Sequence, residues 1–392
     1  MASNKNTRIE SIDFIRGVAV LGILVMNSLS FALPVSAYFN HSSEGATNII
    51  DWIIIFFQEI FIAQKMMGLF SLLFGASFVL FLESLRIKGY KKPKIIILWR
   101  NFILLLVGVI HAYFWMGDIL TIYAILSIIL LFFYKRNILL LLFLAVFFTY
   151  FSSILALIFQ SFFDSEGNLS KTIIEQSIFT DKIGLGKFWF TDSSILGEAM
   201  GLYFLVDIAC RSLGMMLLGI CLYRLNFLSA EFEKKTYIKL IIPGFIVGII
   251  LGLISLVWYQ IEDYSPEIAL IANIPNKIGI IPLVVSYVGL CSLLYKKISN
   301  KYSSYFVSTG RMAFTNYLSQ TILCFIIFNL LFSSNNFSRK EIIIFVFIIW
   351  IIQLIWSKYW MSRFNQGPLE FIWRKITYLG KNKWLPRQDS NL

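Results

Sequence analysis

Long apolar runs follow one another along this chain, and short polar segments separate them. A helix that crosses a bilayer needs about 20 mostly apolar residues. Segments that meet this length or come close to it are 12–33, 64–85, 95–115, 118–134, 137–161, 200–223, 238–260, 276–295, 306–332 and 341–360. The pattern therefore predicts an all-α protein, a polytopic transmembrane helical bundle of about ten spans.

Two segments leave questions about this arrangement. The apolar stretch 49–62 is either an interfacial helix or the upper half of one long, broken second span. The polar stretch 162–199 is the one long outer loop, and its aromatic residues Trp189 and Phe190 favour the membrane surface. We expect a single membrane domain, with helices in 12–161, the outer loop at 162–199, helices in 200–360 and a cytosolic tail at 361–392.

Positive charges predict the orientation. Most of the 34 lysines and arginines fall in tails and loops that share one side of the membrane if the N-terminus is inside. Cytoplasmic loops carry such an excess of basic residues. The chain is thus expected to be a multi-pass protein of a bacterial-type inner cell membrane, with both termini in the cytosol. We expect its first span to stay uncleaved, because Asp13 and Arg16 lie at its start.

Composition supports the membrane assignment and excludes other classes. Hydrophobic residues make up 58% and charged residues 14% of the chain, whereas soluble domains carry about 25% charged residues. The net charge of +12 is spread over loops, so we expect no nucleic-acid partner. All four cysteines lie in apolar runs, and two histidines leave no metal-ligand cluster, so neither a disulfide nor a metal site is expected.

Charged residues inside the spans are the candidates for function. An ionised side chain costs at least about 2.5 to 3.5 kcal/mol at mid-depth, yet the spans or their edges hold Arg16, Lys65, Arg100, Arg211 and Arg311. In the first span, Arg16 follows Asp13 by three residues and precedes Asn27 by eleven, so the three share one helical stripe. The simpler alternative is an ion pair that only locks helix packing.

Both histidines are candidates for chemistry. Arg100 and His111 are eleven residues apart, which places His111 about 16 Å higher on nearly the same face. Asp118 follows closely, and a histidine near a carboxylate in a dry site can act as a general base. A lone helical histidine is more often structural, however. His41 lies in the first outer loop, where a solvated position is the simplest interpretation.

Three further polar patterns follow in the second half. Asp207 and Arg211 have the i, i+4 spacing of a structural ion pair. In 306–332, Arg311 opens a polar run in which Asn316 and Gln320 share a face, and so many polar groups favour a lined cavity over simple packing. After the last span, a Gly-Pro turn at 367–368 predicts a short amphipathic cytosolic helix, whose simplest role is an interfacial anchor.

At these residues the chain resembles the YeiB-like family of bacterial membrane proteins. The matching segments are 13–17, 22–27, 70–75, 108–111, 117–120, 214–219, 310–320 and 367–374. They are spread over nearly the whole chain. Motifs of soluble enzymes such as GxSxG and the P-loop are absent from the sequence, so any chemistry is expected within the membrane.

The first span is also similar to that of transmembrane acyltransferases such as the heparan glucosaminide acetyltransferases. Those enzymes use cytosolic acyl-CoA to modify an acceptor on the opposite face. Their functional pair, an Asn at the end of helix 1 and a His in the following loop, corresponds to Asn27 and His41. His111 instead matches the YeiB-like pattern, so the two histidines compete for the catalytic role.

The resemblance implies that residues at the two ends of the bundle have different roles. Acyl-CoA is the expected co-substrate, with no permanently bound cofactor, and Arg16, Arg100 and Arg311 are expected to hold its phosphates. Asp13, Asn316 and Gln320 complete the expected substrate-binding residues. His111, with Asp118, deprotonates a cell-envelope acceptor, and Asn27 orients the carbonyl or stabilises an oxyanion. The alternatives are a transporter of a small anionic or lipid-linked solute, which would use the same arginines, and a non-catalytic membrane partner.

Overall fold

The computed structural model describes residues 9–34, 37, 40–42, 45–160, 195–265, 268–332 and 336–379. Within these ranges every regular element is a helix, which confirms the predicted all-α polytopic bundle. Most of the predicted outer loop, including Trp189 and Phe190, and the tail beyond 379 lie outside the described residues. The helix after this loop, α9, begins at 195, earlier than the predicted 200.

Nine helical segments in the described ranges are long and apolar enough to cross a membrane. They are Glu10–Ala32, Ile49–Ile87, Pro93–Phe114, Ile138–Gln160, Leu202–Arg224, Lys234–Ile261, Ile274–Lys297, Ala313–Leu331 and Arg339–Met361. A shorter apolar helix, Leu120–Phe133, occupies the place of the fourth predicted span. Each of the predicted spans therefore has a helix.

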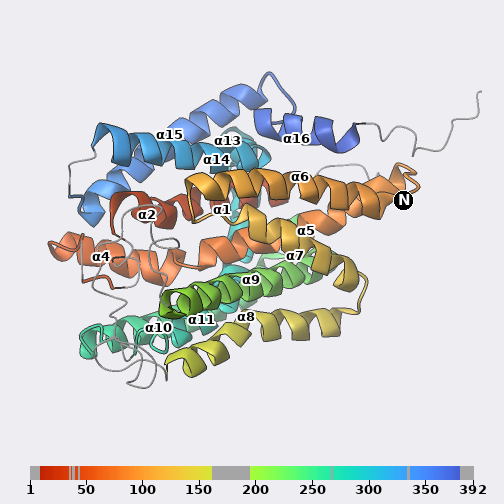
Figure 1. Ribbon diagram of the computed structural model, residues 1–392. Helices are drawn as coiled ribbons and strands as arrows, with labels where there is room; N and C mark the ends of the chain where they lie inside the picture. Colours follow the sequence, from red (N-terminus) through yellow and green to blue (C-terminus); the bar gives the residue numbers. More distant parts are fainter. Residues whose placement is uncertain are drawn as a thin grey trace, which may run out of the picture.

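The second span is one broken helix, so the second interpretation of 49–62 is right. It consists of α4 (Ile49–Phe57), the π-helix η1 (Gln58–Ile62) and α5 (Lys65–Ile87), which follow one another across Figure 1. The break lies at Ala63 and Gln64, where Gln64 has a left-handed φ of 63°. Residues rarely adopt this conformation unless the surrounding structure holds them in it.

The predicted span 306–332 is also divided. It contains the end of α13 (Asn300–Arg311), then α14 (Ala313–Cys324) and the π-helix η4 (Phe325–Leu331), with Met312 between the two α-helices. Before it, α11 (Ile274–Ile278) and α12 (Ile280–Lys297) form another interrupted span. In the part of the chain that the structure describes, these three spans are thus interrupted.

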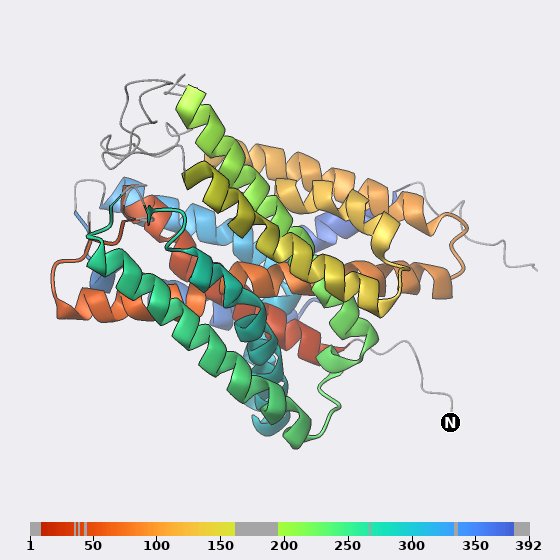
Figure 2. The same ribbon diagram turned by 90° about the horizontal axis from the view of Figure 1, so that it is seen from below.

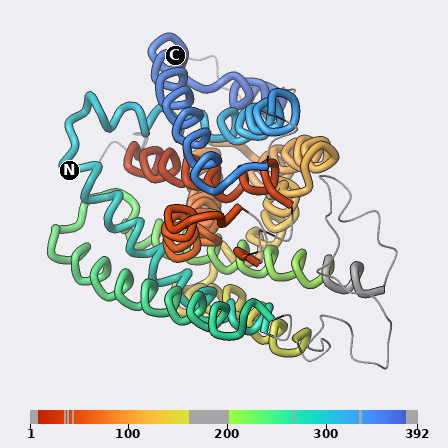
Figure 3. The backbone as a smooth tube through the Cα atoms, turned by 90° about the vertical axis from the view of Figure 1, so that its left-hand side faces the viewer, coloured from red at the N-terminus to blue at the C-terminus, as the bar shows by residue number. Residues whose placement is uncertain are grey.

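The first span consists of α1 (Glu10–Asn27) and its extension α2 (Leu29–Ala32). The remaining helices are α6 (Pro93–Phe114), α7 (Leu120–Phe133), α8 (Ile138–Gln160), α9 (Ile195–Arg224), α10 (Lys234–Ile261), α15 (Arg339–Met361) and α16 (Pro368–Tyr378). Figures 1 and 3 show α1, α4 and α5 between the blue C-terminal helices and the layer of α8, α9 and α10. Helices α8 and α9 lie side by side (Figure 2).

Close glycine crossings hold the central helices together. A Cβ on Gly310 would lie 1.8 Å from the carbonyl oxygen of Asp13, and one on Gly17 would lie 2.1 Å from that of Phe306. Only glycine lets α1 and α13 approach so closely. Because Arg16 and Arg311 directly neighbour these glycines, the crossing also brings two arginines of different helices into one region.

The outer surface of the bundle is apolar. Large hydrophobic side chains are exposed along α6, α8, α10 and α15. A soluble protein rarely exposes such continuous apolar surface, whereas the hydrocarbon of a bilayer accommodates it. The chain is therefore a membrane protein.

Candidate functional site

A cavity of about 410 Å³ opens where α5, α6, α13, α14 and α16 meet. Its volume falls within the range of about 300 to 1,000 Å³ that is usual for ligand sites. The cavity lies toward the end of the bundle that carries the basic loop 88–92, which we call the inner end because its charges predict a cytosolic position.

The cavity lining is strongly basic. One acidic residue, Glu370, lines it together with the basic residues Arg16, Lys88, Arg100, Arg311 and Arg374. Arginine guanidinium groups bind phosphate and carboxylate through paired hydrogen bonds. The composition of the lining therefore favours a ligand with several negative charges.

Arg16 is fixed by neighbours on two helices. Its Nη1 donates to Asp13 Oδ1 at 2.7 Å and its Nη2 to Ser77 Oγ at 2.7 Å. Asp13 is buried and does not line the cavity. The stripe predicted on the first span thus contains an ion pair in which Asp13 positions Arg16. Of these two residues, Arg16 is the one that lines the cavity.

Arg100 lies between two aromatic rings. Its guanidinium carbon is 4.3 Å from the ring centre of Phe81 and 4.0 Å from that of Trp373. Among the described residues, no carboxylate comes close enough to Arg100 for an ion pair. Cation–π contacts hold the group in place and leave its donors available for an anion.

The deep end of the cavity is aromatic. It is lined by Phe70, Phe74, Tyr123 and Tyr317, and the Tyr123 hydroxyl is 2.6 Å from Ser71 Oγ. Tyr317 also contacts the next polar group along α6, because its ring centre is 5.4 Å from that of His111. His111 itself does not line the cavity. One side chain, Tyr317, therefore lies between the basic cavity and the histidine.

His111 forms the pair with Asp118 that the sequence predicts. Its Nδ1 is 2.8 Å from Asp118 Oδ1, and its Nε2 is 2.9 Å from Thr321 Oγ1. The second oxygen of Asp118 accepts the backbone N–H of Thr121 at 2.9 Å and so caps the start of α7. An oriented, buried imidazole with a carboxylate on Nδ1 is suited to proton transfer at Nε2.

Asn27 ends α1 close to this pair. Ser30 Oγ donates to the carbonyl of Asn27 at 2.7 Å and accepts from Trp115 Nε1 at 3.0 Å. The Trp115 ring lies 5.6 Å from the His111 ring, centre to centre. The end of the first span and His111 thus belong to one outer-side region.

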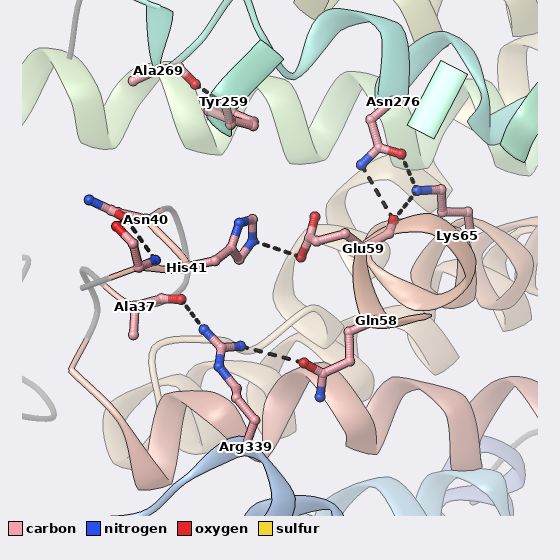
Figure 4. A network of polar contacts seen from close by, with 11 residues as sticks. Ala37, Asn40, His41, Gln58, Glu59, Lys65, Tyr259, Ala269, Asn276 and Arg339 are labelled. Atoms are coloured by element: carbon pink, nitrogen blue, oxygen red, sulfur yellow. Dashed lines mark hydrogen bonds and ion pairs between the residues drawn. The ribbon is translucent and has the colours of Figure 1, made fainter. Parts of the chain in front are cut away.

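His41 is buried, so the interpretation as a solvated loop residue is wrong. Only 3% of its surface is exposed, and Nε2 lies 3.2 Å from Glu59 Oε1 (Figure 4). Tyr259 and Tyr264 present their rings to it edge-on. Burial raises the pKa of Tyr264 to about 12. Glu59 could not be predicted as a partner from local spacing, because the two residues are 18 positions apart and belong to different elements.

The break in the second span is held by a polar network beside His41 (Figure 4). Lys65 Nζ donates to the carbonyl of Glu59 at 2.6 Å and to Asn276 Oδ1. Arg339 Nη2 donates to the carbonyl of Ala37 at 2.6 Å. The carbonyl of Glu59 in the π-helix thus finds donors from α5 and α11, as backbone groups in a membrane require, while Arg339 of α15 ties the first loop to this region.

Asn316 and Gln320 do not line the cavity, contrary to our expectation for this polar face. Asn316 Nδ2 donates to Ser357 Oγ at 3.0 Å, and Gln320 Nε2 donates to Gln353 Oε1 at 2.9 Å and to the carbonyl of Val20 at 3.0 Å. These partners on α15 and α1 accept from the N–H groups of the two amides inside the bundle. Their role in this structure is to join helices.

The ion pair predicted between Asp207 and Arg211 is present and includes a third residue. Arg211 Nη2 is 2.5 Å from Asp207 Oδ2, and Lys277 Nζ is 2.8 Å from Asp207 Oδ1. All three side chains are buried. The spacing predicted the pair, but Lys277 lies 70 residues away and could not be found from it.

Comparisons with known proteins agree with the family resemblance. The chain is 30% identical to the uncharacterized protein YxaH of Bacillus subtilis, over 97% of this chain and 96% of that protein. The chain belongs to the YeiB-like family. It is also 29% identical to the uncharacterized protein YeiB of Escherichia coli, over 94% of this chain and 95% of that protein.

A family model described as a protein of unknown function, DUF418, matches residues 222–380. This part of the YeiB-like chain includes α13, α14, α15 and α16, and with them Arg311, Glu370 and Trp373 of the cavity. The glycines of the YeiB-like segments 70–75 and 214–219 also have a structural reason. A Cβ on Gly75 would lie 2.0 Å from the carbonyl of Met216, and one on Gly219 would lie 1.8 Å from that of Leu72.

Proposed function

We propose that this protein is a transmembrane acyltransferase of a bacterial cell membrane, which moves an acyl group from cytosolic acyl-CoA to an acceptor at the outer face. The observation that supports this function most is the basic cavity at the inner end. Several cationic side chains surround it, one carboxylate partly offsets them, and the ring of Tyr317 separates it from the His111–Asp118 pair.

The lining matches the parts of a CoA molecule. Arg16, Arg311 and Arg374 offer charge-assisted hydrogen bonds to phosphate groups. Aromatic side chains such as Phe81 and Trp373 offer faces for stacking. The narrower aromatic end at Tyr123 and Tyr317 would receive the pantetheine arm and its thioester.

His111 has the geometry of a general base in the transfer step. With its Nδ1–H held by Asp118, Nε2 takes the proton from an acceptor hydroxyl or amine. The acceptor atom then forms a bond to the thioester carbonyl carbon, and the bond from carbon to sulfur breaks. The proton on Nε2 passes to the departing CoA thiolate, so the histidine returns to its starting state. Asn27 would hold the carbonyl oxygen.

This function requires Tyr317 to turn aside, because its ring lies between the cavity and His111. Its hydroxyl accepts the backbone N–H of Ile119 at 3.3 Å, which is a long hydrogen bond and therefore a weak restraint. Rotation of this side chain would join the cavity to the histidine.

Titration of the purified protein with CoA, together with thioester consumption in membrane vesicles, tests the proposal. We expect Arg100→Ala to weaken CoA binding, and His111→Ala to abolish thioester consumption while CoA still binds. His41→Ala serves as the matched histidine control and should leave both readouts near the wild-type level. If the wild-type protein does not bind CoA, the acyltransferase proposal is wrong.

Transport is the second candidate, because the outer half of the bundle carries features found in transporters. The second span is broken at Ala63 and Gln64, and a buried charge cluster of Asp207, Arg211 and Lys277 lies in the bundle. Discontinuous helices with interior charges are typical of ion and solute pathways. Flux of an anionic solute into proteoliposomes without thioester consumption would favour this function.

A further inference from the structure

Helix α16 places the one acidic residue of the cavity lining at the start of another helix. Glu370 Oε1 accepts the backbone N–H groups of Phe314 at 2.8 Å and Thr315 at 3.1 Å, while Oε2 accepts the Thr315 hydroxyl at 2.6 Å. The first amides of α14 would otherwise have no partner within their helix. A carboxylate from a distant segment therefore caps α14.

This carboxylate occupies a position that a phosphate can also occupy. Backbone N–H groups and the helix dipole make a helix N-terminus favourable for any anion. The basic residues of the cavity lining outnumber Glu370, so one carboxylate leaves most of their charge uncompensated. A phosphate group has more acceptor oxygens and more negative charge, and it can therefore compete for the same donors.

Asn101 is a second feature of the cavity that favours a polar ligand. Its side chain lines the cavity and is only 5% exposed, yet Nδ2 has no hydrogen-bond partner. A buried amide donor normally has a partner, because leaving it unpaired is costly. A polar acceptor bound in the cavity would complete this group.

The rest of α16 is attached to the cavity wall through α6. Trp373 Nε1 donates to the carbonyl of Arg100 at 2.9 Å, and Trp99 Nε1 donates to the carbonyl of Ile376 at 3.2 Å. At the start of the helix, a Cβ on Gly367 would lie 2.1 Å from Glu370 Oε2. The glycine thus lets the carboxylate fold back to α14. The amphipathic helix expected as a membrane anchor is in this structure a cover of the cavity.

We propose that Glu370 is a built-in placeholder for a phosphate group of the ligand. When a phosphorylated ligand enters, its phosphate takes the amides of Phe314 and Thr315 and Glu370 leaves them, while Trp373 and Arg374 keep α16 at the cavity wall. For the ligand class, a CoA-type phosphate ester, this inference rests on the proposed function. Glu370 then sets the affinity for the donor by competing with it.

Isothermal titration of the purified full-length protein with CoA tests the placeholder directly. The neutral variant Glu370→Gln should bind CoA about tenfold more tightly than the wild type, since it competes without a charge. Glu341→Gln is the matched control, because Glu341 caps α15 through the Ser338 hydroxyl and backbone N–H, away from the cavity. This control should bind CoA like the wild type.

The outcomes separate this inference from the proposed function. Equal or weaker CoA binding by Glu370→Gln, with clear binding by the wild type, overturns the placeholder and leaves the acyltransferase proposal in place. If neither protein binds CoA, the proposed donor is wrong and the placeholder for its phosphate is wrong with it.

Discussion

Trp373 and Arg100 contact each other twice. The guanidinium of Arg100 lies 4.0 Å from the centre of the Trp373 ring, and the indole N–H donates to the backbone carbonyl of Arg100 at 2.9 Å. The first contact uses the side chain and the second uses the main chain of the same residue. Helix α16 is thereby fixed to α6 at the wall of the cavity.

This double contact makes Trp373 a specific target. Trp373→Ala removes both contacts and should weaken CoA binding about 2- to 30-fold, which corresponds to a cation–π contact of about 0.5 to 2 kcal/mol. Trp373→Phe keeps an aromatic face and loses only the N–H donor, so its affinity should lie between those of the wild type and the alanine variant. Titration with CoA measures all three. A phenylalanine variant as weak as the alanine variant would contradict the cation–π account.

The crossing of α1 and α13 predicts a sharp difference between two glycines. Gly310→Ala puts a methyl group where the carbonyl oxygen of Asp13 is 1.8 Å away, so the helices must separate. We expect a loss of stability of about 3 kcal/mol or more. Gly68→Ala meets only side-chain methyl groups, the nearest at 3.3 Å, and should change stability far less.

Thermal unfolding in detergent compares these two variants under the same conditions. The predicted order is wild type close to Gly68→Ala, with Gly310→Ala clearly lower. Similar melting temperatures for the two variants would show that the close approach at Gly310 is not essential to the bundle.

The carboxyl group of Glu370 predicts a pH dependence of stability. Burial is the largest influence and raises its pKa above the ordinary value of 4.5, while hydrogen bonds from Thr315 and Phe314 act in the opposite direction. The folded protein therefore holds this proton more tightly than the unfolded chain does. Its contribution to stability is greatest below about pH 4.5 and is lost as the pH rises through the higher folded pKa.

Glu370→Gln removes this titration. As the pH rises from 4.5, the melting temperature of the wild type should fall relative to that of the variant. This change should stop once Glu370 is ionised in the folded state. A difference that is constant over the same pH range would contradict a raised pKa at Glu370.

The network at the break of the second span predicts a cost for its removal. Asn276→Ala takes away the side chain that accepts from Lys65 and leaves a buried ammonium group with fewer partners. An unsatisfied buried polar group costs about 1 to 3 kcal/mol, and a charged one costs more. The unfolding midpoint of Asn276→Ala should fall accordingly, and an unchanged midpoint would contradict a structural role of this contact.

Much of the fold could be predicted because membrane spans are long and apolar. The hydrophobic pattern located the helices, and charge placement predicted an orientation for them. The hydrophobic pattern could not show that the span 306–332 is divided at Met312. This interruption depends on contacts with other helices, such as those of Asp13 with Gly310 and of Glu370 with Phe314. Local spacing carries no information about such long-range contacts.

The candidate site was predictable only in part, for the same reason. Spacing of 3 or 4 residues on one helix identified Asp13 with Arg16 and Asp207 with Arg211, and closeness along the chain identified His111 with Asp118. Contacts between distant segments were not visible, so Glu59, Lys277 and the cavity-facing role of Glu370 were missed. The sequence around Asn316 and Gln320 fits either a cavity lining or a contact between helices. The position of α15, whose side chains accept from both amides, shows that they join helices.

Photo-crosslinking with an acyl-CoA that carries a diazirine at the end of its acyl chain tests the central claim most directly. The donor is predicted to label peptides of α6 or α14 near His111 and Tyr317, and excess CoA should suppress this labelling. Labelling confined to the region of His41 and Glu59, or labelling that CoA does not suppress, would contradict acyl transfer through the basic cavity toward His111.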